Sequence, residues 1–420
     1  MTNSFTIERW FLFGIVSFIF FLIIGATFGS LGVALPSMLL ELGWSWPQAG
    51  TGFTILALLT GITALIPAWM LRRFGIKSTY GTGGLVMTCG FVLLATCHSI
   101  TQFYLATALL GYGFSHCATV PAVHMLNNWM PDKRSLAIGW YMTIGGLGGV
   151  AGPLLVTSVE SATGSWRMYW WLVAASMFLI TLVAVIFVKA EPDRKLKDEE
   201  VADPLFEKQS ERVYKTATDW NYRDVVLCPQ YYVIVAAMSM TLFCTVTMSA
   251  WAVVHMGTFG VSTAIAATAM SSQALLNAAS RAFGGILATR IDPKWLLVSA
   301  LLAEVIGMMG LSIADNPVMI ALFVFGEGYG FGMCLFATTI LLFNYFGPKQ
   351  NPEILGTLNL ITTVAMVGPV LAGYIGYTYG GFGIVFQGYA FFLLLIAVAV
   401  AMMRPPTAKQ VDIVATNTTK

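Results

Sequence analysis

Apolar runs of about 20 residues, each long enough to cross a lipid bilayer as a helix, recur along almost the whole chain. Charged residues, prolines and polar clusters separate these runs from one another. The twelve expected spans are 11–36, 48–71, 79–98, 101–126, 135–158, 166–189, 231–255, 262–288, 295–313, 317–343, 353–377 and 382–403. Because lipid offers backbone groups no hydrogen-bond partners, spans of this kind fold as helices. The pattern predicts an all-α polytopic membrane protein.

The composition argues against several classes of function. Of the 420 residues, 57% are hydrophobic and only 10% are charged, against about 25% charged in a soluble domain. A compact soluble fold could not hide that much apolar surface, so a soluble enzyme, a nucleic-acid binder and a disordered regulator are disfavoured. The six cysteines form no CxxC pair and no convergent metal ligands are visible, so we expect no cofactor and no metal site.

The basic residues of the loops predict the orientation. The loops after the second, fourth, eighth and tenth spans are rich in basic residues: Arg72, Arg73, Lys77, Lys133, Arg134, Arg290, Lys294 and Lys349. On the opposite side, Arg167 is the one lysine or arginine at the short loops. The basic side faces the cytoplasm by the positive-inside rule. We therefore expect an integral plasma-membrane protein, most simply of a bacterial inner membrane, with both termini in the cytoplasm. Mixed charge in the polar segment 190–230 favours a flexible cytoplasmic linker.

An internal repeat divides the chain into two halves. Gly111-Tyr112-Gly113-Phe114 recurs as Gly328-Tyr329-Gly330-Phe331, at an offset of 217 residues, and Cys117, Pro131 and Gly139 recur at the same offset. The repeat predicts a six-helix bundle over 1–189, the linker 190–230, a second bundle over 231–403 and a cytoplasmic tail over 404–420. Parallel repeats of this kind place a substrate site between the halves and work by alternating access.

With twelve spans, a duplication and short basic loops after the second and eighth spans, the chain resembles the major facilitator superfamily. The loop pattern of that family, Gly-x-x-x-Asp-Arg-x-Gly-x-Arg/Lys, is matched in part by Ala68–Lys77, where Ala68 and Arg72 replace the Gly and the Asp. The second copy keeps Gly285 and Arg290. The resemblance implies that Arg73, Gly75, Gly285 and Arg290 serve gating or orientation rather than substrate contact.

A narrower resemblance covers the entry to the fifth span. The sequence Trp129-Met130-Pro131-Asp132-Lys133-Arg134-Ser135-Leu136-Ala137-Ile138-Gly139 is similar to the corresponding segment of monocarboxylate transporters, which runs aromatic, hydrophobic, basic pair and then Leu-Ala-x-Gly. This resemblance implies a small organic monoanion as the substrate.

Arg281 is the leading candidate for contact with that anion. It lies in the span 262–288, roughly 12 Å from the cytoplasmic end, where an ionisable group costs about 2.5–3.5 kcal/mol without a partner or a cavity. A guanidinium grips a carboxylate through two parallel hydrogen bonds, and Asn277 lies one turn earlier on the same face. Monocarboxylate transporters also carry an arginine in the eighth span, which implies an anion clamp. The alternative is a structural ion pair with Glu327 or Glu304.

Glu327 and His116 are the candidates for proton coupling. Glu327 lies near the middle of the span 317–343, where a carboxyl group can carry a proton or stay ionised beside Arg281. His116 follows the repeated Gly-Tyr-Gly-Phe element and is either a substrate or proton contact or a hydrogen-bonded core histidine. Glu304 lies in the ninth span, which the superfamily places outside the central cavity, and a packing role is favoured. Polar and aromatic candidates for lining the substrate site are Tyr112, Tyr141, Trp251, Tyr329 and Asn359.

These features predict a secondary transporter of a small organic monocarboxylate, coupled to protons or working by exchange, and not an enzyme. We expect a monomer whose partners are the organic anion, the proton and the lipid bilayer, and no nucleic acid. A single intramembrane arginine fits one carboxylate better than two. The alternatives are a proton-driven exporter of drugs or lipophilic cations with the same fold, and a membrane receptor that binds without transporting. A channel is disfavoured because no re-entrant filter loop is visible.

Overall fold

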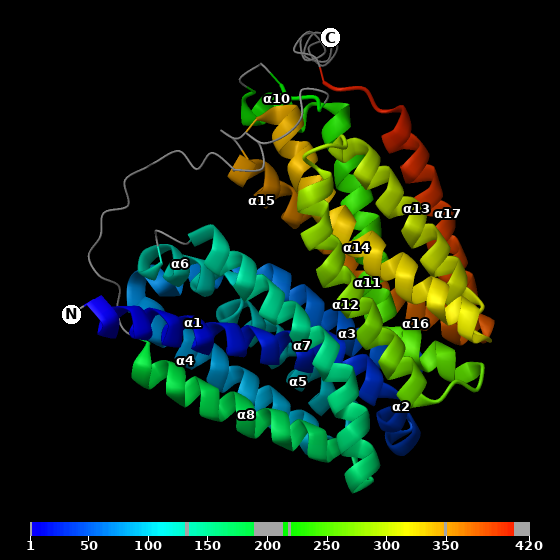
Figure 1. Cartoon of the computed structure of the whole chain (residues 1–420). Coiled ribbons are helices and arrows are strands. Elements are labelled where there is room, and N and C mark those ends of the chain that lie inside the picture. The colour runs from blue at the N-terminus through cyan, green and yellow to red at the C-terminus, as the bar shows by residue number, and fades with distance from the viewer. Residues whose placement is uncertain (1, 131–133, 189–212, 217–219, 348–350, 407–420) are drawn as a thin grey trace, which may run out of the picture. The chain divides into compact units, whose positions relative to one another are not determined.

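The structure, a computed structural model, describes residues 2–130, 134–188, 213–216, 220–347 and 351–406 (Figure 1). All regular secondary structure in these residues is helical. Nine of the described helical segments are long and apolar enough to cross a membrane. The expected spans 48–71, 101–126 and 262–288 are helical as well, but they consist of shorter or more polar helices. The prediction of an all-α membrane protein is therefore confirmed.

The described residues of the first half form ten helical elements. They are α1 (Thr2–Ile24), the π-helical η1 (Gly25–Gly29), α2 (Leu31–Leu42), α3 (Trp46–Ile62), the 3-10 turn η2 (Thr63–Leu65), α4 (Ile66–Ala95), α5 (Ile100–Cys117), α6 (Thr119–Trp129), α7 (Arg134–Thr163) and α8 (Trp166–Phe187).

The described residues of the second half are helical as well. Its elements are α10 (Tyr222–Val226), α11 (Pro229–Thr258), α12 (Thr263–Leu287), α13 (Pro293–Ser312), α14 (Pro317–Phe346), α15 (Asn351–Thr362), the 3-10 turn η4 (Thr363–Val367), α16 (Gly368–Tyr379) and α17 (Gly383–Met402). The short helix α10 falls inside the expected linker. Residues 190–212 and 217–219 of that linker, and 407–420 of the expected tail, lie outside the described residues.

The described chain forms two compact units whose limits differ from the expected halves. Among the described residues, unit 1 contains 2–130, 134–188, 246–275 and 367–382, and unit 2 contains the others. Residues of α11 and α12 therefore contribute to both units, and η4 is divided between them at 366–367. The bundle boundaries expected from the repeat remain a prediction.

Glycines bring the helices of unit 2 close together near its polar residues. A Cβ on Gly332 of α14 would lie 2.4 Å from the backbone oxygen of Asn277, so α12 and α14 touch at this point. A Cβ on Gly326 would lie 2.4 Å from the backbone oxygen of Ala303, which brings α13 equally close to α14. Small residues permit this backbone approach, which is the usual way for membrane helices to pack.

Candidate functional site

Arg281 and Asn277 form a pair on one face of α12. The Nε of Arg281 donates a hydrogen bond of 3.0 Å to the Oδ1 of Asn277, one turn earlier. The guanidinium carbon lies 5.6 Å from the centre of the Phe331 ring, so α14 also supports the side chain. Because Nε is used by Asn277, the two terminal amino groups of the guanidinium remain for a bidentate partner.

The side chains around Arg281 test the alternative that it forms a structural ion pair with Glu327 or Glu304. The side chain is exposed on unit 2. Within the described residues, no carboxylate of Glu304, Glu327 or any other side chain forms an ion pair with it. Because a guanidinium inside a membrane span needs water or an anion rather than lipid, Arg281 is suited to bind an anion.

Glu327 and Glu304 lie inside unit 2, and both side chains are 0% exposed. Glu327 Oε1 accepts a hydrogen bond of 2.8 Å from Thr245, and Glu304 Oε2 accepts one of 2.9 Å from Thr241. Both threonines lie on α11. Sequence reasoning missed these threonines, since a hydroxyl in an apolar span carries no signal that its partner is an acid on another helix.

His116 is fully buried in unit 1, where it packs on Gly83 of α4. Its Nδ1 lies 2.9 Å from the backbone oxygen of Tyr112, and the two rings stack with centroids 4.3 Å apart. This hydrogen bond places the ring proton on Nδ1 and leaves Nε2, which has no hydrogen-bond partner in the described residues, as an acceptor. The arrangement resembles a core histidine more than an exposed contact.

The remaining lining candidates occupy different surroundings. The Tyr329 hydroxyl lies 2.8 Å from the Ser299 hydroxyl, so this side chain packs between α14 and α13. Tyr141 and Trp251 are 0% exposed and belong to unit 1. Tyr141 stacks on Phe20 at 4.5 Å, while the Nε1 of Trp251 donates to the Pro369 oxygen at 2.8 Å. Asn359, on α15, is exposed. Of the predicted substrate-site residues, Asn277 is the one with a hydrogen bond to Arg281 in the part of the chain that the structure describes.

The expected gating residues lie at helix ends and breaks. Gly75 interrupts α4 with φ 78° and ψ 175°, so the loop between the second and third spans is a single sharp bend. Arg73 precedes the bend, and its guanidinium lies 5.7 Å from the Trp69 ring and 5.6 Å from the Phe74 ring. In the second copy, Gly285 remains inside α12 and Arg290 follows its end.

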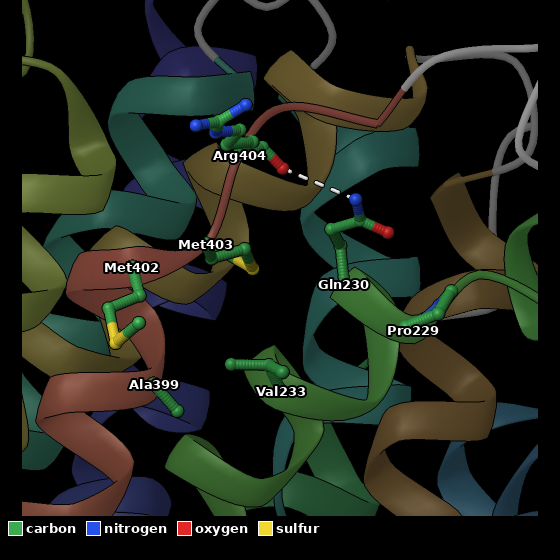
Figure 2. Close-up of a pocket in the computed structure, with 7 residues that line it drawn as sticks. All are labelled: Pro229, Gln230, Val233, Ala399, Met402, Met403 and Arg404. Carbon is green, nitrogen blue, oxygen red and sulfur yellow. Dashed lines mark hydrogen bonds between the residues drawn. The ribbon is translucent and has the colours of Figure 1, made fainter.

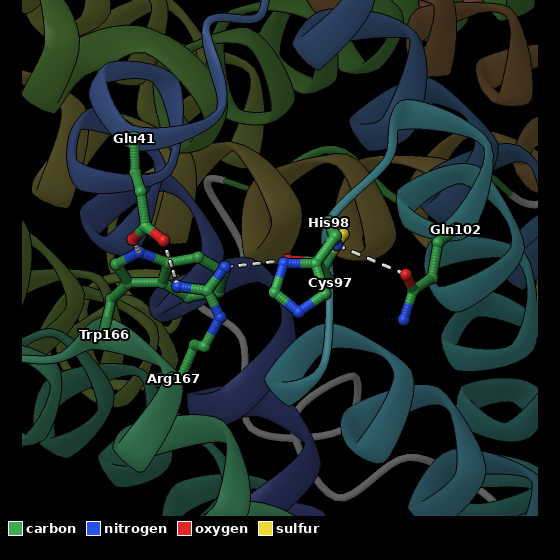
Figure 3. A network of polar contacts seen from close by, with 6 residues as sticks. All are labelled: Glu41, Cys97, His98, Gln102, Trp166 and Arg167. Carbon is green, nitrogen blue, oxygen red and sulfur yellow. Dashed lines mark hydrogen bonds and ion pairs between the residues drawn. The ribbon is translucent and has the colours of Figure 1, made fainter.

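An ion pair in unit 1 was not foreseen from the sequence. Arg167 hydrogen-bonds through Nη1 to Glu41 Oε1 and donates a bond of 2.9 Å to the Cys97 oxygen (Figure 3). Trp166 Nε1 donates to Glu41 Oε2 at 2.7 Å. The bond from Arg167 is the main reason that the pKa of the Glu41 carboxyl lies below its ordinary value of 4.5. Glu41 lies beyond the expected span 11–36, so this network joins the end of α2 to the start of α8 on the side that we expect to be outer.

A shallow pocket of about 240 Å³ lies where the start of α11 meets the end of α17 (Figure 2). Gln230 donates from Nε2 to the Arg404 oxygen at 3.3 Å across one side of it. The pocket is lined by Pro229, Gln230, Val233, Ala399, Met402, Met403 and Arg404. None of the residues predicted to bind substrate lines it.

A family model described as the Major Facilitator Superfamily matches residues 16–269 and 233–417. The oxalate:formate antiporter of Oxalobacter formigenes is 23% identical over 322 residues, which cover 76% of this chain and 71% of that protein. A probable sulfoacetate transporter of Cupriavidus necator is 26% identical over 195 residues, covering 46% of this chain and 45% of that one.

Solved structures show the same fold. A bacterial homologue of the human lysosomal transporter Spinster, in an inward-facing and unoccupied conformation, has a TM-score of 0.73 at 17% identity, covering 94% of this chain and 96% of that one. The nucleoside transporter NupG has a TM-score of 0.71 at 14% identity, covering 94% of this chain and 100% of that one.

Proposed function

Because the chain belongs to the Major Facilitator Superfamily, we propose that it moves a small organic monocarboxylate across the membrane by alternating access, with Arg281 as the residue that binds the carboxylate. The family makes the chain an integral membrane transporter rather than an enzyme. The substrate class, the coupling to protons and the action as a monomer belong to the proposal, as do the bacterial inner membrane and the cytoplasmic termini.

The observation that carries the proposal is the exposed, unpaired guanidinium of Arg281. Asn277 accepts a hydrogen bond from its Nε, and the terminal amino groups supply further donors. Two parallel hydrogen bonds to one carboxylate would satisfy these donors and offset the charge. Two relatives are named for transport of oxalate, formate and sulfoacetate, which supports an organic anion as the substrate. Of these three anions, formate alone is a monocarboxylate without a second acidic group.

Proton coupling is proposed for Glu327, which is buried on α14 in the same unit as Arg281. A buried carboxyl that takes up and releases a proton would neutralise the charge of a monoanion that moves with it. Tyr112, His116, Tyr141, Trp251, Tyr329 and Asn359 remain proposed substrate contacts, and of these only Asn359 is exposed in this state.

Thermal stabilisation of the purified protein by a panel of small carboxylates tests the proposal. A ligand at about 100 times its dissociation constant stabilises the state that binds it by about 2.7 kcal/mol. We expect a shift with a monocarboxylate that is lost in Arg281→Gln and weakened in Arg281→Lys, because lysine keeps the charge without the fork. Arg223→Gln, which removes an exposed arginine of α10, is the matched control and should keep the full shift.

Two results would count against the proposal. Stabilisation by cations or neutral drugs, with no response to any carboxylate, would favour the exporter of the same fold. An unchanged shift in Arg281→Gln would remove Arg281 from the binding site.

A further inference from the structure

We propose that Glu304 and Glu327 form a single proton-binding site in which two carboxyl groups on neighbouring helices share one proton. The inference deepens the proposed proton coupling, and it gives Glu304 a role beyond packing. Its first experiment uses no substrate, so it succeeds or fails independently of the anion assignment.

Helix packing brings the two acids close together. A Cβ on Gly330 would lie 2.4 Å from the Cγ of Glu304, and a Cβ on Gly307 would lie 2.7 Å from the backbone nitrogen of Glu327. Residue 304 therefore faces residue 330, and residue 307 faces residue 327. The acids are offset along the contact between α13 and α14 by three residues, or about 4.5 Å of rise.

Two threonines on a third helix, α11, are hydrogen-bonded to the two carboxyl groups. Thr241 donates to Glu304 and Thr245 donates to Glu327, and the threonines are one turn apart on the same face of that helix. A hydroxyl can donate to a carboxylate and can also accept from a protonated carboxyl. The same two hydrogen bonds are therefore available whichever acid carries the proton.

Each acid also has one oxygen without a hydrogen-bond partner in the described residues. These atoms are Oε1 of Glu304 and Oε2 of Glu327, both on side chains that are 0% exposed. A buried acceptor without a donor is costly, and an isolated buried charge is costlier still. Two such carboxylates side by side would add repulsion, whereas one proton between them supplies a donor and removes one charge.

The groups packed around the pair offer no competing cation. The Sγ of Cys334 on α14 lies 3.2 Å from the Thr241 hydroxyl, and Cys244, which precedes Thr245 on α11, is buried. From α12, the guanidinium of Arg281 bonds to Asn277 instead. Within the described residues, neither acid has an ion pair with a lysine, an arginine or a histidine.

Two tyrosines lie on the neighbouring helices. The ring centre of Tyr389, on α17, which packs on α13, lies 6.4 Å from that of Phe243. The hydroxyl of Tyr329, on α14, is hydrogen-bonded to that of Ser299. The charge at this place in unit 2 therefore depends on the proton count of the two acids. A site that takes up and releases one proton in each transport cycle fits symport with a monoanion. The two glutamates would then carry one positive charge for each negative charge of the substrate.

Infrared spectroscopy of the purified protein in lipid nanodiscs tests the shared proton directly. The carbonyl stretch of a protonated carboxyl group is separate from that of a carboxylate, so it counts the protons held. We expect the wild type to show a protonated buried carboxyl at neutral pH that disappears only in alkali. In Glu304→Gln and in Glu327→Gln the remaining acid has lost its charged neighbour, so its signal should disappear at a lower pH than in the wild type.

The controls keep the test independent of folding. Thr241→Val and Thr245→Val preserve side-chain shape and remove one hydroxyl each, and both should shift the frequency of the carbonyl signal. Glu353→Gln, at an exposed position on α15, should change nothing in this region of the spectrum. Circular dichroism and thermal unfolding verify that each variant is folded.

Three results would overturn the proposal. The first is a wild-type spectrum without a protonated buried carboxyl at neutral pH. The second is a signal that Glu327→Gln removes and Glu304→Gln leaves unchanged in frequency and pH dependence, which would place the proton on Glu327 alone. The third is loss of the signal on adding sodium in place of a large organic cation, which would make the pair a metal-cation site.

Discussion

At the scale of single residues, the hydrogen bond between Arg281 and Asn277 determines which donors remain for a substrate. Arg281 could be found from the sequence because it is an arginine inside an apolar run, and Asn277 because it is one turn away. The bond between them agrees with that spacing. Whether they bind a substrate stays a prediction.

Asn277→Asp tests the balance of charge at this pair. An aspartate one turn before Arg281 would form an ion pair with the guanidinium and compete with the anion. We expect substrate affinity to fall by about tenfold, equivalent to about 1.4 kcal/mol, while Asn277→Ala loses less because it adds no charge. Titration of substrate against the unfolding temperature measures both. Equal affinities for Asn277→Asp and the wild type would contradict the proposed role of the pair.

Glu41 provides a prediction about pH at the same scale. Its pKa in the folded protein is below the ordinary 4.5 because Arg167 and Trp166 donate to its carboxylate. A lowered pKa contributes stability above the ordinary value, and that contribution is lost as pH falls through the lowered value. The unfolding temperature of the wild type should exceed that of Glu41→Gln at neutral pH, and the difference should shrink below pH 4.5. We expect a small difference in unfolding temperature, because the ion pair between Arg167 and Glu41 is partly exposed to solvent. A difference that grows as the pH falls would contradict this prediction.

At the scale of helices, the apolar runs predicted where helices lie but not where they break. The expected span 11–36 contains a π-helical turn at Gly25–Gly29, and the span 101–126 is divided into α5 and α6 at Ala118. Such breaks depend on contacts with other helices: a Cβ on Gly25 would lie 2.6 Å from the Gly148 oxygen of α7. A pattern of hydropathy carries no information about these contacts.

The bend at Gly75 gives a prediction for a single element. Its φ of 78° with ψ 175° is a conformation that only glycine adopts readily. Gly75→Ala should therefore destabilise the protein by about 1–3 kcal/mol, although no atom would touch the new Cβ. Gly139→Ala in α7 is the matched control, because its Cβ also meets open space in an ordinary helix. Thermal unfolding of both variants measures the difference. Equal stability of Gly75→Ala and Gly139→Ala would show that the bend does not require glycine.

At the scale of the whole molecule, the repeat predicted two halves, while the contacts group 246–275 and 367–382 with the N-terminal helices. In unit 1, Trp251 stacks on Phe382 at 4.7 Å and Trp46 lies 4.8 Å from the same ring. These aromatic residues lie at span ends that we expect to be outer. Sequence could not reveal this grouping because hydropathy carries no information about contacts between distant segments. We propose that alternating access separates these contacts in a second state.

Gly50 tests that interpretation. A Cβ at this position of α3 would lie 2.5 Å from the Pro369 oxygen and 3.0 Å from the Trp251 ring. Gly50→Val should therefore force the segment 367–382 away from α3 and raise its rate of amide hydrogen exchange, measured by mass spectrometry. Gly14→Val, where the new side chain meets nothing within 4 Å, should leave exchange in that segment unchanged. Identical exchange in both variants would contradict a contact that gates access.

Transport by the purified protein in proteoliposomes tests the central claim most directly. Vesicles loaded with an unlabelled monocarboxylate should take up the same labelled acid by exchange. The account predicts uptake in the wild type and in Arg223→Gln, a rate lower by about tenfold or more in Arg281→Lys, and none in Arg281→Gln. Uptake of a monocarboxylate by Arg281→Gln at the wild-type rate, or transport restricted to cationic or neutral compounds, would contradict it.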